Sequence, residues 1–257
     1  NLKAFKVLSF SSGNAIMFFA FFNLFGSIIL LPIYLQTLMG YTAMLAGLVL
    51  GPGGIATLIA MPIAGRLVTK MNPKILLAFG MIVSAYSTYL MSQFSLLADF
   101  NTVIWPRVVL GIGMGFLFIP LTTLTMSGIR KEDMGNATAI YNLLRNLGGS
   151  FGVAFVTTML ARRAQFHQNH LVEHLTPFDG NYQIGTAYAS KFLEYKGFES
   201  GLSDYGGLGM VYGKLIKEAS MLSFNDAFYL LCVLMLVILP LVLLMRRGKS
   251  EMPAGMH

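Results

Sequence analysis

Two arginines lie inside long apolar stretches of the sequence, where a cation is rarely found without a function. Arg145 is about ten residues into an expected helix, and therefore about 15 Å from the start of that helix. Arg107 is about four residues into another, so its side chain can reach a polar surface more easily. A cation inside a membrane must be paired, hydrogen-bonded or hydrated. Each arginine therefore indicates either a polar cavity or a packing site in which helix carbonyls bind the guanidinium.

Carboxylates are absent from the interior of these apolar stretches. Asp99, Glu132, Asp133 and Asp226 lie at their edges, and the other acidic residues lie in a long polar segment or near the C-terminus. Proton-coupled transport usually relies on a buried carboxyl group whose pKa can move across the working pH. We therefore expect the coupling acid in another part of a longer polypeptide.

Three expected helices, at about 12–35, 103–129 and 136–160, carry polar and aromatic side chains in stripes at helical spacing. In a bilayer such stripes face other helices or a water-filled cavity. Together they predict a cavity for hydrophobic, weakly polar molecules; the alternative is helix packing through bonded amides and hydroxyls. The candidate cavity residues are Phe19, Phe22, Asn23, Ser27, Met114, Phe118, Tyr141, Asn142 and Arg145.

The composition predicts that these helices lie in lipid. Hydrophobic residues make up 55% of 257 positions and charged residues 11%, whereas soluble domains carry about 25% charged residues. Apolar runs of about 20 residues can cross the hydrocarbon of a bilayer. We therefore expect an all-α integral membrane fold, a bundle of six transmembrane helices. Their expected ranges are 12–35, 43–67, 74–94, 103–129, 136–160 and 226–245.

The net charge of +7 is concentrated at the ends of the apolar runs. The short loops 36–42 and 95–102 contain no Lys or Arg. The positive-inside rule then puts both ends of the chain in the cytoplasm. We interpret the charge as topogenic, and expect no nucleic-acid partner. The inside basic residues would be Lys3, Lys6, Arg66, Lys70, Lys74, Arg130, Lys131, Arg246, Arg247 and Lys249.

Three regions follow from this topology. Residues 1–161 hold the first five helices, residues 162–225 form a long external loop, and residues 226–257 hold the sixth helix and a cytoplasmic tail. Helical patterns at 162–175 and 210–222 predict that the loop is an external helical hairpin. The glycines expected to form turns between its arms are Gly197, Gly201, Gly206, Gly207 and Gly209.

Enzyme chemistry has no recognisable motif in this sequence. We find no nucleophile elbow or phosphate-binding loop. His170 and His174 are four residues apart in the loop, near His167, but no cysteine completes a metal site, and solvated histidines are the favoured interpretation. We therefore predict a protein without catalytic residues, metal or cofactor.

Small residues and a proline mark two helices for close packing or bending. Glycines four residues apart let helices approach closely, and a proline removes a backbone hydrogen bond. The predicted packing residues are Gly51, Pro52 and Gly54 on the second helix, and Gly148, Gly149 and Gly152 on the fifth.

Several short motifs resemble the major facilitator superfamily, in particular its fourteen-helix drug:proton antiporters of the EmrB/QacA type. Residues 65–70 resemble the loop motif after the second helix of each repeat, although Thr69 replaces the family's aspartate and Asn72 its later glycine. Residues 135–152 resemble the thirteenth helix of this branch, and residues 31–41 the junction of its ninth and tenth helices. The residues matched to gating or proton-transfer motifs are Gly65, Arg66, Lys70, Arg107, Gly111, Gly113 and Gly115.

The resemblance implies that the chain is the second repeat, helices nine to fourteen, of a proton-driven efflux permease of the inner (plasma) membrane that works by alternating access. Its partners would be small-molecule drugs or metabolites, the N-terminal half of the same transporter, the lipid bilayer, and a periplasmic adaptor with an outer-membrane channel. The energy source would be the proton gradient. One alternative is an exporter of a specific metabolite, organic acid or siderophore on the same fold; another is a non-transporting membrane scaffold or sensor.

Overall fold

The computed structural model describes residues 2–173, 175–176 and 178–245, and these residues form helices and connecting turns without a β-strand. The all-α membrane fold is thus confirmed. Predictions for His174, for Arg246, Arg247 and Lys249, and for the tail fall outside the described residues. The α-helices are α1 (Leu8–Thr37), α2 (Ala43–Lys70), α3 (Pro73–Met91), α4 (Phe100–Met126), α5 (Met134–Glu173), α6 (Gly180–Tyr195), α7 (Ser200–Ile238) and α8 (Leu241–Leu244); the 3-10 turns η1 (Leu2–Lys6) and η2 (Lys131–Asp133) precede α1 and α5.

Short polar residues fix where three of the membrane helices begin. The side-chain oxygen of an N-cap residue accepts a bond from a backbone amide that has no partner within the helix. Pro73 follows its cap at the first helical position, where a missing N–H does no harm. The cap bonds join Leu45 N to Thr42 Oγ1 (3.3 Å), Lys74 N to Asn72 Oδ1 (3.1 Å) and Thr102 N to Asp99 Oδ1 (3.0 Å).

Five segments of the described chain are long and apolar enough to cross a membrane: α1, α2, α3, α4 and the stretch Ser200–Leu244. The chain is therefore a multi-pass membrane protein. Helix α5 occupies the place expected for the fifth of six spans, but it is not among these segments. Arg145 and the asparagines at 142 and 146 interrupt its apolar sequence. The same residues made it a candidate for a cavity wall.

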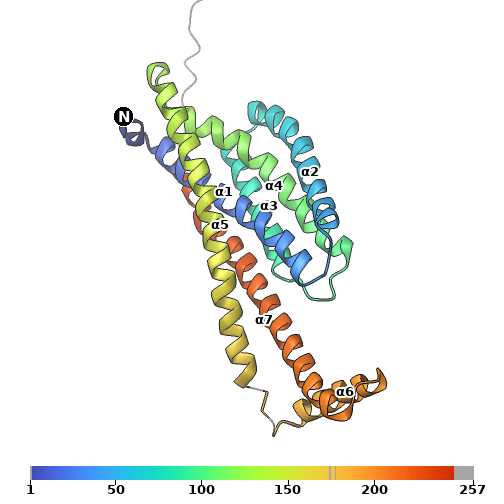
Figure 1. The fold of residues 1–257 in the computed structure, drawn as a ribbon. Coiled ribbons are helices and arrows are strands. Elements are labelled where there is room, and N and C mark those ends of the chain that lie inside the picture. The colour runs from blue at the N-terminus through green and yellow to red at the C-terminus, as the bar shows by residue number, and fades with distance from the viewer. Residues whose placement is uncertain (1, 174, 177, 246–257) are drawn as a thin grey trace, which may run out of the picture.

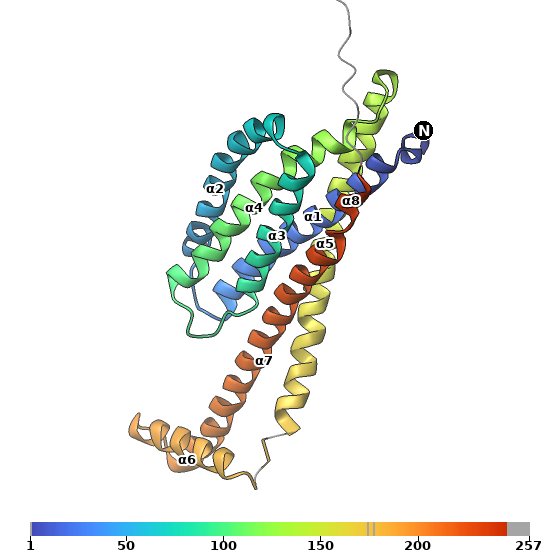
Figure 2. The same cartoon turned by 180° about the vertical axis from the view of Figure 1, so that it is seen from behind.

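Helices α5 and α7 are much longer than expected. The fifth helix does not stop near residue 160 but continues to Glu173, and the sixth begins at Ser200 rather than near residue 226. At 1.5 Å per residue, 40 residues extend about 60 Å, twice the thickness of the hydrocarbon core. Both helices run beyond the bundle, side by side at its base, with α6 packed against α7 at the far end (Figures 1 and 2). We call residues 162–225 the distal arm.

The glycines of the distal arm were expected to make turns, and only Gly197 does so, with a φ of 94°. Gly201, Gly206, Gly207 and Gly209 are helical residues of α7. Two of them let α6 approach, because an added Cβ at Gly207 would lie 2.5 Å from Ser190 Oγ, and one at Gly206 would lie 2.5 Å from Leu193 Cδ1. The stretches predicted to be helical are indeed helical at 162–173 and 210–222, but they are continuations of α5 and α7.

Helices α2, α3 and α4 pack through small residues. An added Cβ at Gly113 would lie 2.5 Å from Ser84 Oγ of α3, and one at Gly115 would lie 2.5 Å from the Cβ of Ala60 of α2. Gly111 packs equally closely on the backbone of Gly53. The three glycines of α4 thus act as contact points for two neighbouring helices.

A second close contact joins α1 and α5. An added Cβ at Gly148 or Gly152 would collide with the backbone of Phe18 or Phe22, and one at Gly149 would lie 3.1 Å from the Phe25 ring. These three glycines were predicted from sequence to pack. Gly51 and Gly54 of α2, predicted on the same ground, have no described neighbour within 4 Å of an added Cβ, and Pro52 lies between them.

Candidate functional site

Arg145 of α5 lies at a seam where α1, α4 and α5 meet. Its Cζ atom is 5.4 Å from the centroid of the Phe21 ring of α1, and that ring is 5.1 Å from the Phe118 ring of α4. The aromatic face attracts the cation, an interaction of about 0.5–2 kcal/mol. One α-turn before Arg145, the Tyr141 hydroxyl lies 3.0 Å from Thr122 Oγ1. We call Phe21, Phe118, Thr122, Tyr141 and Arg145 the arginine seam.

The guanidinium of Arg145 is left with unused binding capacity. Its Nε atom is buried and has no hydrogen-bond partner, and none of the described residues forms an ion pair with it. Buried polar groups are normally bonded, so such an atom needs an explanation. A ligand anion or a polar group on a substrate would satisfy it. The arrangement can therefore hold a molecule that carries an apolar body and a negative or hydrogen-bond-accepting group.

Arg107 occupies a different place, between α1, α2 and α4. Only 8% of its surface is exposed, and its Nη1 donates to Ser27 Oγ at 3.5 Å. An added Cβ at Gly53 would lie 2.8 Å from Arg107 Cγ, so this glycine makes room for the side chain. The Nε of Arg107 is also buried without a partner. The residue joins three helices and is a candidate for polar chemistry inside the bundle.

The predicted cavity set is divided by the structure. Phe118, Tyr141 and Arg145 come together at the arginine seam, and Ser27 lies with Arg107. The Phe22 ring lies 5.5 Å from the Phe155 ring of α5 and 6.3 Å from the Phe19 ring, tilted against both. Met114 is 1% exposed in the core, and Asn142 is half-buried. Asn23 serves another contact: its Nδ2 donates to the carbonyl of Leu231 of α7 at 3.0 Å.

Phe21 was missed by the sequence-based search for the cavity. The polar stripe of α1 led to Asn23 and Ser27, which lie on its faces toward α7 and α4. The side of α1 toward α5 is marked instead by Phe18, Phe21 and Phe25, spaced three and four residues apart. An aromatic stripe at that spacing was the available signal, but any apolar helix offers several such stripes.

A depression of about 550 Å³ lies on the α1–α5 surface next to this stripe. Its walls combine an aromatic ring, small side chains and two polar groups. Since Asn146 and Ser150 are polar and exposed beside the membrane helix α1, a water-filled space or another protein segment suits this face better than acyl chains. The lining residues are Phe25, Asn146, Gly149, Ser150, Val153 and Ala154.

The motif residues at the basic end of α2 lie at or near the protein surface. Arg66 and Lys70 are exposed and Gly65 is half-buried, 3.7 Å from Ile119 if it carried a Cβ. Thr69, which stands where the resemblance expects an aspartate, donates to the Arg66 carbonyl at 2.8 Å. No described residue forms an ion pair with these cations.

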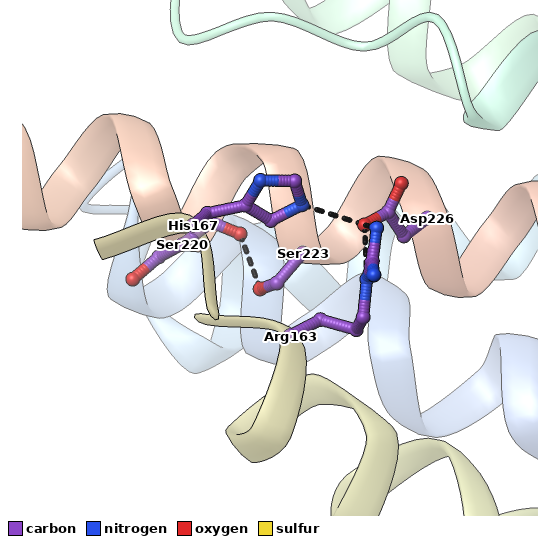
Figure 3. Close-up of polar contacts among 5 residues, drawn as sticks. All are labelled: Arg163, His167, Ser220, Ser223 and Asp226. Atoms are coloured by element: carbon purple, nitrogen blue, oxygen red, sulfur yellow. Dashed lines mark hydrogen bonds and ion pairs between the residues drawn. The ribbon is translucent and has the colours of Figure 1, made fainter. Parts of the chain in front are cut away.

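A clasp of three charged or ionisable side chains joins α5 and α7 at the base of the distal arm (Figure 3). Oδ2 of Asp226 lies 2.6 Å from both Nε and Nη2 of Arg163 and 2.6 Å from Nε2 of His167. Arg163 also covers the Phe166 ring, with Cζ 4.8 Å from its centroid. We call Arg163, His167 and Asp226 the clasp. Sequence analysis had placed His167 among solvated histidines and Asp226 at a helix edge.

Comparison with known proteins finds one matching family and several similar proteins. The sequence profile of the Major Facilitator Superfamily matches residues 2–153. Fatty acid resistance protein FarB of Neisseria gonorrhoeae is 31% identical over 242 residues, and multidrug export protein EmrB of Escherichia coli K12 is 32% identical over 243 residues; each match covers 94% of this chain and 46% of the relative. Lincomycin resistance protein LmrB of Listeria monocytogenes is 31% identical over 161 residues. The chain thus spans about half the length of the first two relatives.

Proposed function

Because the chain belongs to the major facilitator superfamily, we propose that it is part of an exporter that carries hydrophobic drugs or toxic compounds out across the inner membrane by alternating access, driven by the proton gradient. It is a transporter component rather than an enzyme. The names of its relatives, which describe fatty acid resistance and multidrug export, support this proposal. So does their length, since the permease would be completed by an N-terminal half.

The arginine seam is the observation that carries the proposal. It combines two aromatic rings, a tyrosine–threonine hydroxyl pair and a cation whose Nε is unbonded. Aromatic walls accept flat or greasy molecules of many shapes, while one fixed cation orients them. Such a surface favours amphiphiles whose polar end is anionic or accepts hydrogen bonds.

Export of one acidic metabolite is the second candidate, and the same cation favours it. None of the described carboxylates lies within ion-pair distance of Arg145 or Arg107. The site would therefore hold an organic acid or siderophore as readily as a drug. The two candidates differ in breadth: a polyspecific exporter accepts neutral and acidic hydrophobic compounds, and a specific one accepts a single acid.

Inverted membrane vesicles that contain the full-length permease would test both. An imposed pH gradient is followed while hydrophobic drugs, fatty acids and small organic acids are added one at a time. We expect several chemically unrelated compounds to release protons. Release by one acid alone would favour the specific exporter, and no release by any compound from well-inserted protein would overturn proton-driven export.

We also propose that the distal arm contacts a periplasmic adaptor that leads to an outer-membrane channel. Its tip exposes large aromatic side chains far from the bundle, and tyrosine is enriched at protein interfaces. Replacing Tyr195 and Tyr205 by Ser should abolish co-purification of an adaptor while leaving membrane insertion intact. The control is Tyr86→Ser, which replaces an exposed tyrosine of α3 outside the distal arm. Unchanged co-purification of the adaptor with the double variant would contradict the proposal. The most exposed aromatic residues of the tip are Phe178, Tyr188, Tyr195 and Tyr205, between 74% and 94% exposed.

A further inference from the structure

A groove of about 690 Å³ runs between α3 and the α7–α8 junction, and it shares no residue with the arginine seam. Pro240 interrupts the last membrane helix between Ile238 and Leu241, and the groove opens beside this interruption. Apart from two polar residues at one end, its lining is aliphatic or aromatic. The lining residues are Asn72, Lys74, Ile75, Ala78, Phe79, Ile82, Leu239, Pro240, Val242 and Leu243.

The apolar part of the groove is suited to an acyl chain. Ile75, Phe79 and Ile82 repeat along one face of α3 and are about half exposed, while Leu243 on the opposite wall is 78% exposed. In a protein that crosses a membrane, such a surface lies in hydrocarbon. A hollow that follows the helix axis holds a flexible chain better than a compact solute.

The mouth of the groove carries a cation without a carboxylate partner. Lys74 Nζ donates to the carbonyl of Leu243 across the groove at 3.3 Å, and none of the described acidic residues forms an ion pair with it. Arg66 and Lys70 are exposed at the same end of the bundle, where α2 meets α3. This end therefore presents positive charge at the depth where phospholipid phosphates lie.

We propose that this groove is a binding site for one anionic phospholipid, with an acyl chain along α3 and its phosphate held by Lys74. The ammonium releases the Leu243 carbonyl or bonds it together with the phosphate, since an ammonium has three donors. The site is separate from the arginine seam and does not depend on the transported substrate. It assigns Lys74 a role beyond fixing topology.

Photo-labelling of the full-length permease in liposomes tests this assignment. Phosphatidylglycerol and phosphatidylcholine probes, each with a diazirine in the acyl chain, are compared at equal concentration, and labelled peptides are mapped. We expect the phosphatidylglycerol probe to label residues 75–82 and 239–243 more strongly than the phosphatidylcholine probe does. Lys74→Gln should lower that labelling about fivefold, the effect of about one basic residue near an anionic surface, while the phosphatidylcholine label stays the same.

Two further variants separate the charge from the hollow. Lys70→Gln removes a cation from the same end but outside the groove, and should lower labelling less than Lys74→Gln does. Ala78→Phe fills the groove and should lower labelling by both probes. Equal labelling by the two lipids in the wild type, or equal effects of Lys74→Gln and Lys70→Gln, would overturn the proposal. Absence of labelling of the groove by either lipid would also overturn it.

Discussion

The arginine seam and the clasp use the same kind of side chain in opposite ways. At the clasp, Arg163 and His167 both bind one carboxylate oxygen at 2.6 Å, so the charges of the cluster are committed to each other. At the seam, Arg145 has an aromatic face on one side and an unbonded Nε. A satisfied ion cluster fixes two helices, whereas an unsatisfied cation leaves capacity for a ligand. The contrast separates a structural arginine from a candidate binding arginine within one helix, α5.

The largest effect is expected at the seam. Arg145→Ala should lower export of an acidic hydrophobic substrate about 10- to 100-fold, because a hydrogen bond to a charged group contributes about 1.5–3 kcal/mol. Arg145→Lys should retain part of the activity. Export rates in vesicles with equal amounts of inserted protein measure this. Arg162→Ala, on the exposed surface of α5, is the matched control, and an equal loss of export there would show that the effect is not specific to the arginine seam.

A second effect concerns how the distal arm is held together beyond the clasp. Gly207→Leu should push α6 away from α7, since even a Cβ would lie 2.9 Å from the backbone nitrogen of Ser190. Overpacking of this kind costs about 1–3 kcal/mol. Hydrogen exchange should show lost protection in Gly180–Tyr195 only. Gly209→Leu, where nothing lies within 4 Å, should leave α6 protected; loss of protection in both variants would contradict this packing.

Opening the clasp should have a smaller effect. Asp226→Asn removes the negative charge and leaves Arg163 and His167 facing each other. Because the three side chains are 14–38% exposed, water screens their charges. We therefore expect the free energy of unfolding of the distal arm to fall by about 1 kcal/mol. Protease cleavage between 160 and 173 should become faster while export of hydrophobic substrates persists. If export fell as far as in Arg145→Ala, the clasp would belong to the transport machinery.

The smallest effect is expected at Asp99, a carboxylate held by neutral donors instead of cations. The Thr102 hydroxyl, and then the Thr102 amide, lower the pKa of this exposed N-cap. A folded-state pKa below the unfolded value of about 3.9 means that the stabilisation is present above that pH and disappears as the pH falls through the folded pKa. The difference in melting temperature between wild type and Asp99→Ala should shrink below about pH 4. A constant difference would show that the cap acts without its charge.

The membrane fold could be predicted because lipid imposes strong rules on composition and helix length. Long apolar runs located α1 to α4 and the first part of α5, and the embedded Arg145 marked α5 as a candidate cavity wall. The length of α5 and α7 was not predictable in the same way. Helical patterns were recognised at 162–175 and 210–222, but beyond the hydrocarbon the sequence does not show whether such a pattern continues a membrane helix or forms a separate one.

The candidate site could be predicted only in part. Arg145 was identified because an embedded cation is rare. Phe118 was chosen from the stripe of the helix predicted at 103–129, and Tyr141 from the helix that carries Arg145. Asn23 was grouped with them because polar stripes do not show which neighbour they face, and it bonds to α7 instead. The clasp was missed since Arg163 and Asp226 are 63 residues apart, and nothing local in the sequence connects them.

The most direct test of the central claim is whether Arg145 senses the charge of a ligand. Dissociation constants of a long-chain fatty acid and of its uncharged methyl ester would be measured on full-length permease, for wild type and for Arg145→Ala. We predict that the wild type binds the acid about tenfold or more tightly than the ester, and that the variant binds both alike. The same preference for the acid in both proteins would contradict the assignment of Arg145 as a ligand-binding cation.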